Sequence, residues 1–296
     1  MLLAALLTVW VPAARAQAPV PADPLAQSLL ARVAFAGTPE ERAFFEMLTR
    51  RMLESPTARE LAAEVLASPL PVSARFSDLP GTELYERREG RVAFDATEAG
   101  RAVRSRDGAV VELNRACLKI DPDYARLDCV RHLAHELFGH TLGLLRAPTA
   151  EDRALYLYYD DEYEARLVGW IVTVELAGEL RDPEPACALA DPAAYRRYIQ
   201  RTYPSSSASL SLDELGDPVG AWRRRASQGV SEKALGWVRE SLGYFQGDGA
   251  AALPGLTAVS RDAFFAALPQ RARSLEARLS SYGDRLFVVS DCSDYR

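Results

Sequence analysis

The spacing of the histidines constrains this chain more than any other feature. All three histidines of the 296-residue sequence lie within residues 131–141. His135 and Glu136, followed by His140, form an HExxxH pattern. It is one residue longer than the HExxH pattern that places two zinc-binding histidines on one face of a helix. In a regular α-helix a separation of five residues turns two side chains roughly 140° apart, which is too far for one ion.

A π-bulge would remove this conflict. It inserts one residue into a helical turn, so that His140 would occupy a position equivalent to i+4, and such bulges occur mostly at functional sites. Gly139 fits a bulge because it removes side-chain crowding and loosens the helix. After Phe138 the apolar positions also shift by one residue, to Leu142 and Leu145. We therefore predict a metal-binding helix that widens near Gly139.

A second helix is predicted to be capped by Asp160 or Asp161 and to run to about residue 180. It is apolar on nearly all sides, which is typical of a buried helix. Glu162 and Glu164 lie in its first turn, and a buried carboxylate needs a partner such as a metal. The two acids lie about 200° apart on the helix, so only one can face the ion. Ala165, three residues after Glu162, leaves room on that face for an approaching helix.

These two segments carry a family resemblance. Residues 135–140 resemble the HExxGH signature of the dipeptidyl peptidase III family of metallopeptidases at every fixed position, and residues 161–165 resemble its second element. The resemblance implies Zn2+ as the cofactor and three metal ligands, His135, His140 and Glu162. It also implies that Glu136 is catalytic, as the general base that activates a metal-bound water. It covers only these two segments of a much smaller chain, so activity on dipeptides is not part of the expectation.

A second resemblance competes with the first. Without Phe138 the segment would read HELGHTLGL, which is similar to the metzincin helix. A third histidine follows in that family, but Arg146 occupies its place here. The metzincin resemblance therefore explains fewer of the residues.

Three further side chains are candidates for supporting the ligands: His132, Glu164 and Tyr159. His132, one turn before His135, is also a candidate for stabilising an oxyanion. Two functions stay open: an exported zinc metallopeptidase that hydrolyses peptide bonds, with a peptide or protein as substrate, and a non-catalytic zincin-like binding protein with a structural metal or none. An HExxxH pattern also arises by chance on amphipathic helices.

Composition argues against one class of partner. The chain is 48% hydrophobic and 26% charged, as in ordinary globular proteins, and its net charge is −6. Its densest basic cluster is Arg223-Arg224-Arg225, which we interpret as a solvated helix face. Because no basic stripe is present in the sequence, no nucleic-acid partner is expected.

The N-terminal sequence predicts export. Residues 2–11 form an apolar run of signal-peptide length, and Ala14-Arg15-Ala16 supplies small residues for cleavage after Ala16. The run is too short to span a bilayer, so no stable membrane span is expected. We predict a signal peptide (1–16), a linker (17–23) and one catalytic domain (24–296) in a periplasmic or secreted protein.

Four cysteines in an exported chain are compatible with two disulfides, as is typical of oxidising compartments. Cys117 and Cys129 flank the approach to the metal helix, and Cys187 and Cys292 lie farther along the chain. Three pairings are open, and the sequence does not choose among them. No CxxC pair occurs, which argues against a zinc–thiolate site.

The predicted fold class is α+β, a mostly helical zincin-like domain with a small sheet before the metal-binding helix. Helices are expected in residues 24–70 and 182–296, with strands at 72–76, 91–95 and 109–113. Thr38-Pro39-Glu40-Glu41 is a strong helix start. Residues 110–114 are interpreted as either an edge strand that binds an extended peptide or a core strand. Residues 204–207 are predicted to form a loop, and 285–289 a final strand.

Overall fold

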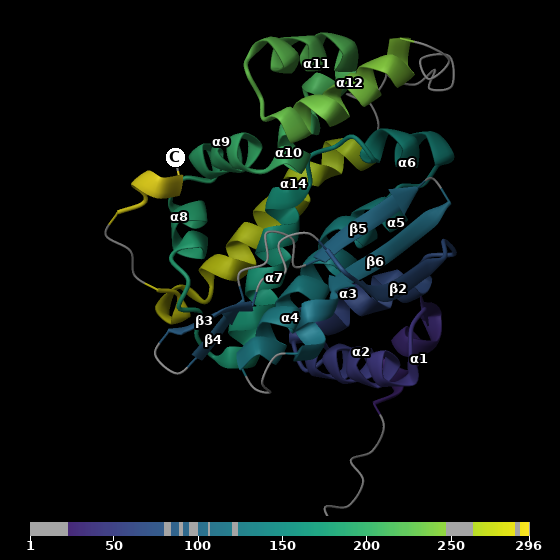
Figure 1. Ribbon diagram of the computed structural model, residues 1–296, viewed down its shortest axis with the longest axis vertical. Helices are drawn as coiled ribbons and strands as arrows, with labels where there is room; N and C mark the ends of the chain where they lie inside the picture. The colour runs from purple at the N-terminus through teal and green to yellow at the C-terminus, as the bar shows by residue number, and fades with distance from the viewer. Residues whose placement is uncertain are drawn as a thin grey trace, which may run out of the picture.

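Figure 1 shows the computed structural model, which describes residues 23–79, 84–88, 91–94, 100–105, 107–119, 124–246, 263–287 and 291–295. The structure is mostly helical with a small sheet, which confirms the α+β prediction. The expected signal peptide and all but the last residue of the expected linker lie outside the described residues. Within these ranges, no helix has the length and apolar character needed to cross a bilayer.

The N-terminal part is helical apart from one short strand. It contains α1 (Pro24–Arg32), β1 (Val33–Phe35), α2 (Pro39–Met52) and α3 (Pro56–Ala67). The predicted start of α2 is confirmed: the Thr38 side chain accepts a hydrogen bond from the Glu41 N–H, and the Glu41 carboxylate accepts one from the Thr38 N–H. The strand β1 was not predicted from the sequence.

Four strands form a mixed sheet in the order β1-β2-β6-β5. Its other members are β2 (Val72–Ser77), β5 (Gly100–Ser105) and β6 (Gly108–Asn114). Strands β1, β2 and β6 run parallel, whereas β5 runs antiparallel to β6. The strands predicted at 72–76 and 109–113 are therefore present, and β5 is an addition.

The interpretation of residues 110–114 as an edge strand is wrong. They belong to β6, which pairs with β2 on one side and β5 on the other, so the core-strand alternative is confirmed. The strands at the two edges are β1 and β5, and β5 contacts the metal helix. The strand predicted at 91–95 is β4 (Arg91–Phe94), which pairs with β3 (Leu84–Arg88) in a separate two-stranded sheet.

The predicted metal helix consists of three consecutive parts. After a short 3-10 turn, η1 (Arg115–Lys119), come α4 (Tyr124–Ala134), a π-helix η2 (His135–Thr141) and α5 (Leu142–Arg146). The N–H of Leu142 donates to the carbonyl of Leu137, five residues back, as a π-turn requires. The predicted widening of the helix is therefore confirmed.

The second helix of the motif is α7 (Glu162–Ala177). It ends about three residues earlier than predicted, because Gly178 adopts a left-handed conformation with φ 78° and stops the helix. As expected, α7 is buried on nearly all sides, and it packs against both α4 and η2. An unpredicted helix, α6 (Ala150–Tyr156), precedes it and begins at a capping box of Thr149 and Asp152.

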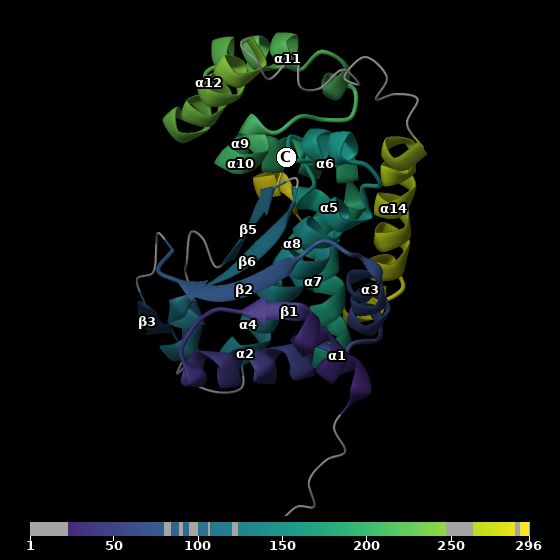
Figure 2. The same ribbon diagram turned by 90° about the vertical axis from the view of Figure 1, so that its right-hand side faces the viewer.

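The C-terminal part is helical, as predicted. Its elements are α8 (Glu184–Ala190), α9 (Pro192–Thr202), α10 (Pro204–Ala208), η3 (Glu214–Gly216), α11 (Pro218–Ser227), α12 (Glu232–Gln246), α14 (Ala263–Ser280), η5 (Gly283–Arg285) and η6 (Ser293–Tyr295). Figures 1 and 2 place α11 and α12 at the opposite end of the molecule from α1 and α2. Helix α7 lies between the sheet and α14 (Figure 2).

Three predictions for this part need correction. Residues 204–207 are not a loop but lie in α10, because Pro204 suits the first turn of a helix. The predicted strand at 285–289 is reduced to one bridge between Leu180 and Leu286, and residues 288–289 lie outside the described ranges. Arg225 is not solvated: it is buried, donates to Glu214 at 2.5 Å, and donates to the carbonyls of Ser206 and Ser207.

Two disulfides connect distant segments. Cys117–Cys129 joins η1 to α4, and Cys187–Cys292 joins α8 to the C-terminal tail. This is one of the three pairings that the sequence left open. Disulfides form and persist in oxidising compartments, so the pairing is consistent with an exported protein.

Candidate metal centre

The π-turn brings the two motif histidines together. The Nε2 atoms of His135 and His140 lie 3.1 Å apart, and their rings meet edge to face with centroids 4.8 Å apart. Both rings are largely buried. The extra residue between them is absorbed by the wider turn, so the two imidazoles point to a common place instead of diverging.

Glu162 reaches the same place from α7. Its Oε2 lies 3.3 Å from His140 Nε2 and 3.7 Å from His135 Nε2. Its other oxygen, Oε1, accepts a hydrogen bond of 2.8 Å from Arg166, whose Nη1 donates to Glu184 at 2.7 Å. Arg166 therefore holds one oxygen of Glu162 and leaves the other directed at the two imidazoles.

Close packing of α7 on the π-helix makes this convergence possible. A Cβ at Gly139 would lie 2.5 Å from the Cα of Ala165, and closer still to the Ala165 Cβ. A residue larger than glycine would push the helices apart, because real Cβ atoms do not approach so closely. The small residues expected from the sequence at 139 and 165 are thus direct partners.

A carboxylate orients the second histidine. His140 Nδ1 lies 2.7 Å from Asp161 Oδ1. Because a carboxylate oxygen can only accept, Nδ1 carries the hydrogen and donates it, which leaves the lone pair of the neutral ring on Nε2. Metal-binding histidines usually have such a partner on the other ring nitrogen.

Asp161 is itself held by two residues that the sequence did not identify. The Arg104 guanidinium of β5 donates to Asp161 Oδ2, and the Tyr156 hydroxyl also bonds to the Asp161 carboxylate. Burial raises the pKa of Asp161, but Arg104, His140 and Tyr156 lower it by more. The Asp161 side chain does not cap α7, although the residue precedes its first turn. The position of Asp161 directly before Glu162 was the one feature of the sequence that indicated a role for Asp161 at this centre.

Glu136 also lies close to His135. Its Oε1 is 3.9 Å from His135 Nε2, the side chain is buried, and its Oε2 has no hydrogen-bond partner. Burial raises the pKa of Glu136 to about 8 in the metal-free protein. His135, Glu136 and His140 offer ligand atoms within 4.8 Å of one another, so this group could hold a metal ion. Glu162 lies nearer to both imidazole nitrogens than Glu136 does to His135.

Burial and neighbouring charges set the protonation of the three candidate ligands in the metal-free protein. Burial lowers the pKa of His135, which favours the neutral imidazole that a metal requires. Burial also lowers the pKa of His140, but Asp161 outweighs it and raises the pKa well above its usual value, so a metal that binds His140 displaces a proton. Burial raises the pKa of Glu162, but His135 and Arg166 outweigh it and lower the pKa, so Glu162 is ionised.

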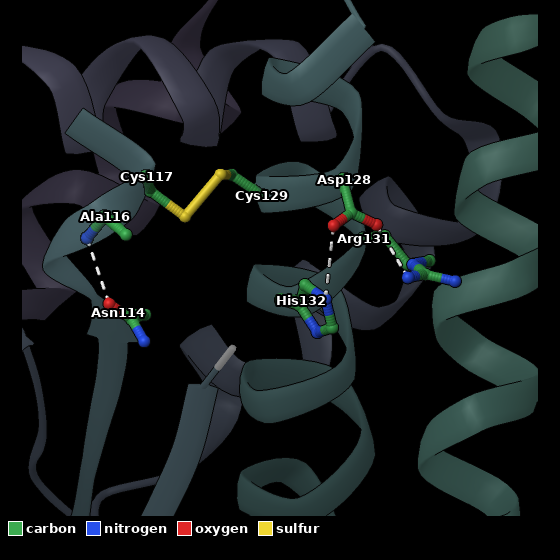
Figure 3. The surroundings of a disulfide bond; sticks show 7 residues. All are labelled: Asn114, Ala116, Cys117, Asp128, Cys129, Arg131 and His132. Carbon is green, nitrogen blue, oxygen red and sulfur yellow. Dashed lines mark hydrogen bonds and ion pairs between the residues drawn. A yellow bond between two sulfur atoms is a disulfide. The ribbon is translucent and has the colours of Figure 1, made fainter. Parts of the chain in front are cut away.

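The three residues expected to support the ligands lie as follows. His132 Nε2 is 3.5 Å from Asp128 Oδ2, and Asp128 also pairs with Arg131 (Figure 3). Glu164 accepts hydrogen bonds of 3.2 Å from Arg196, so it faces a different direction from Glu162. Tyr159 is buried beside Tyr156, with ring centroids 5.6 Å apart.

Comparisons with protein-family models, with curated proteins and with solved structures find no match to this chain. The interpretation of the centre therefore rests on its own geometry.

Proposed function

We propose that this protein is an exported, zinc-dependent metallopeptidase. The observation that carries the proposal is the convergence of His135 Nε2, His140 Nε2 and Glu162 Oε2 across a π-turn. Two imidazoles and one carboxylate are a ligand set of catalytic zinc sites, which keep a fourth position open.

The residues at the centre fit such an ion. Both imidazole Nε2 atoms and one anchored carboxylate oxygen face one another, and one oxygen of Glu136 beside them is buried without a partner. Glu162 is the better third ligand because it lies nearer and is held by Arg166. A zinc ion bound here would polarise a peptide carbonyl and make a bound water more acidic.

Glu136 is the residue placed to move the proton. Among the described acids only Glu162 lies nearer to His135 Nε2, and Glu162 is held by Arg166. Its free Oε2 would accept a proton from the attacking water and pass it to the leaving amine, as a general base and then a general acid. Burial, which raises its pKa, supports this exchange near neutral pH.

The position of the edge strand β5 is an argument for a peptide as the substrate. It pairs with β6 on one side, ends the sheet on the other, and contacts the π-helix. An extended peptide can add to such an edge through main-chain hydrogen bonds. The role assigned to residues 110–114 on the basis of sequence therefore passes to residues 100–105.

The two disulfides and the apolar N-terminal run support export to a periplasmic or extracellular location.

The test compares the wild-type protein with Glu136→Gln and, as a control, Glu179→Gln on the exposed surface. Metal content is measured by elemental analysis, and hydrolysis by digestion of a peptide library at neutral pH, with and without a chelator. We expect near-stoichiometric zinc in all three proteins, chelator-sensitive hydrolysis by wild type and control, and a loss of at least about 100-fold in Glu136→Gln.

Three results would contradict the proposal. Bound zinc with equal hydrolysis by Glu136→Gln would remove the enzymatic role, and zinc with no hydrolysis by any protein would favour the non-catalytic binding protein. Absence of stoichiometric metal from the wild type would remove both zinc-dependent functions.

A further inference from the structure

A cavity of 220 Å³ lies behind the metal helix, between the π-helix, α5, α7 and α14. Its walls are mainly apolar and include Leu61, Phe138, Val168, Leu268 and Leu275. The metal helix itself forms one wall of the cavity through Gly139 and Gly143. The volume suits a small molecule rather than a drug-sized ligand or a peptide.

Two charged side chains of this lining, Arg271 and Glu164, each have one buried polar atom without a hydrogen-bond partner among the described residues. Arg271 of α14 lines the cavity, and its Nη1 is buried without a hydrogen-bond partner in the described structure. The guanidinium lies over the Phe264 ring, 5.1 Å from its centroid. Leaving a buried charged donor unpaired is unfavourable, so this nitrogen has a strong preference for an acceptor.

The neighbouring charges do not supply that acceptor. Arg146 lines the same cavity and is engaged in two hydrogen bonds of 2.7 Å with Glu64. Glu164 also lines it: its Oε1 accepts from Arg196, and its Oε2 is buried but makes no hydrogen bond to Arg271. Burial lowers the pKa of Arg271, and the positive charge of Arg146 lowers it further.

We propose that this cavity binds a small carboxylate with an apolar body, with the carboxylate on Arg271 and the body against the apolar walls. A guanidinium matches a carboxylate in geometry and can bind it through two parallel hydrogen bonds. The unpaired Nη1 accounts for the anionic end of the ligand, and the aliphatic and aromatic walls account for the rest.

This site is separate from the metal ligands but shares an element with them. Phe138 and Gly139 line the cavity and belong to the π-helix that carries His135 and His140. The proposal does not depend on hydrolytic activity, because binding is measured directly on the intact chain.

The test is a calorimetric titration of the full chain with hexanoate, and with hexanamide as a neutral probe of the same shape. We expect saturable one-to-one binding of hexanoate, and at least tenfold weaker binding of hexanamide. Arg271→Met should weaken hexanoate binding at least tenfold. Arg273→Met is the control. Arg273 is an exposed arginine on the same helix, and it donates to Gln270. This change should alter the affinity for hexanoate less than twofold.

Absence of saturable hexanoate binding up to about 10 mM would overturn the proposal. Equal binding of hexanoate and hexanamide would also overturn it, because the charge would then play no part. The comparison of the two probes uses only wild-type protein, so it decides the question even if Arg271→Met does not fold. Titrations of metal-free protein separate this result from any failure of the proposed peptidase activity.

Discussion

Gly139 of the π-helix and Ala165 of α7 lie so close that no side chain fits at position 139. A Cβ there would approach the Ala165 Cα to 2.5 Å, and this contact involves backbone that cannot rotate away. Glu162 lies one turn before Ala165 on α7, so the contact also sets the distance between the histidines and the third candidate ligand.

Gly139→Ala is therefore expected to destabilise the protein by about 1–3 kcal/mol, the usual cost of overpacking, and to weaken metal binding. Urea unfolding and zinc titration measure the two effects. Gly236→Ala in α12 is the control, because a Cβ at Gly236 meets nothing within 4 Å. That change should stabilise the protein by about 0.5–1 kcal/mol through helix propensity. Equal stability of Gly139→Ala and wild type would show that the two helices are not in this contact.

Asp161→Asn should reduce metal affinity without unfolding the protein. The change removes the charge that orients His140 through Nδ1, and replacing such partners typically costs about 10–100-fold in affinity. Competition with a chromogenic chelator measures the affinity. Asp160→Asn is a matched control on the adjacent acid, which accepts from the Glu162 N–H at 3.4 Å. A similar loss in both variants would contradict a specific role for Asp161.

His140→Ala should release the metal, whereas His132→Ala should retain most of it. His140 Nε2 faces His135 Nε2 and Glu162, while His132 pairs with Asp128. Metal content after dialysis, measured by elemental analysis, distinguishes the two variants. Equal loss in both would mean that the ligand set is wrong.

The local parts of the centre could be predicted because they depend on spacing along one helix. The conflict between a five-residue separation and a single ion required a wider turn, and the structure contains a π-helix from His135 to Thr141. The acids at 162 and 164 were placed correctly in the first turn of a buried helix.

The non-local parts could not be predicted. Arg104 meets Asp161 only because β5 pairs antiparallel with β6 at the sheet edge, and the sequence does not show strand order. The same limitation made the edge-strand interpretation of residues 110–114 wrong, since the parallel pairing of β2 with β6 buries them. The strand β1 was missed because its three residues follow a helix directly and carry too short a pattern.

Glu112 should make the free energy of unfolding depend on pH in the acid range. It is buried on β6, where it accepts hydrogen bonds from Arg75, Arg101 and Ser77. Burial raises the pKa of Glu112, but these hydrogen bonds lower it by more. Since the folded pKa lies below the usual value of 4.5, this stabilisation is present above pH 4.5 and is lost as pH falls through the folded pKa.

Glu112→Gln should therefore be less stable than wild type at neutral pH, and the difference should shrink below pH 4.5. Urea unfolding from pH 3 to pH 7 measures it. Glu54→Gln, at an exposed ion pair with Arg51, is the control and should change stability by less than about 0.5 kcal/mol. A constant difference between Glu112→Gln and wild type across this range would contradict the prediction.

The two disulfides should differ in their contribution to stability. Cys187–Cys292 closes a loop of 105 residues, and Cys117–Cys129 closes one of 12. If the cross-links act by restricting the unfolded chain, their loss costs about 5 and about 3 kcal/mol respectively. We expect Cys187→Ser with Cys292→Ser to lower the free energy of unfolding more than Cys117→Ser with Cys129→Ser, as measured by urea titration. The opposite order would show that Cys117–Cys129 acts mainly on the folded state, where it joins η1 to the helix that leads into the metal centre.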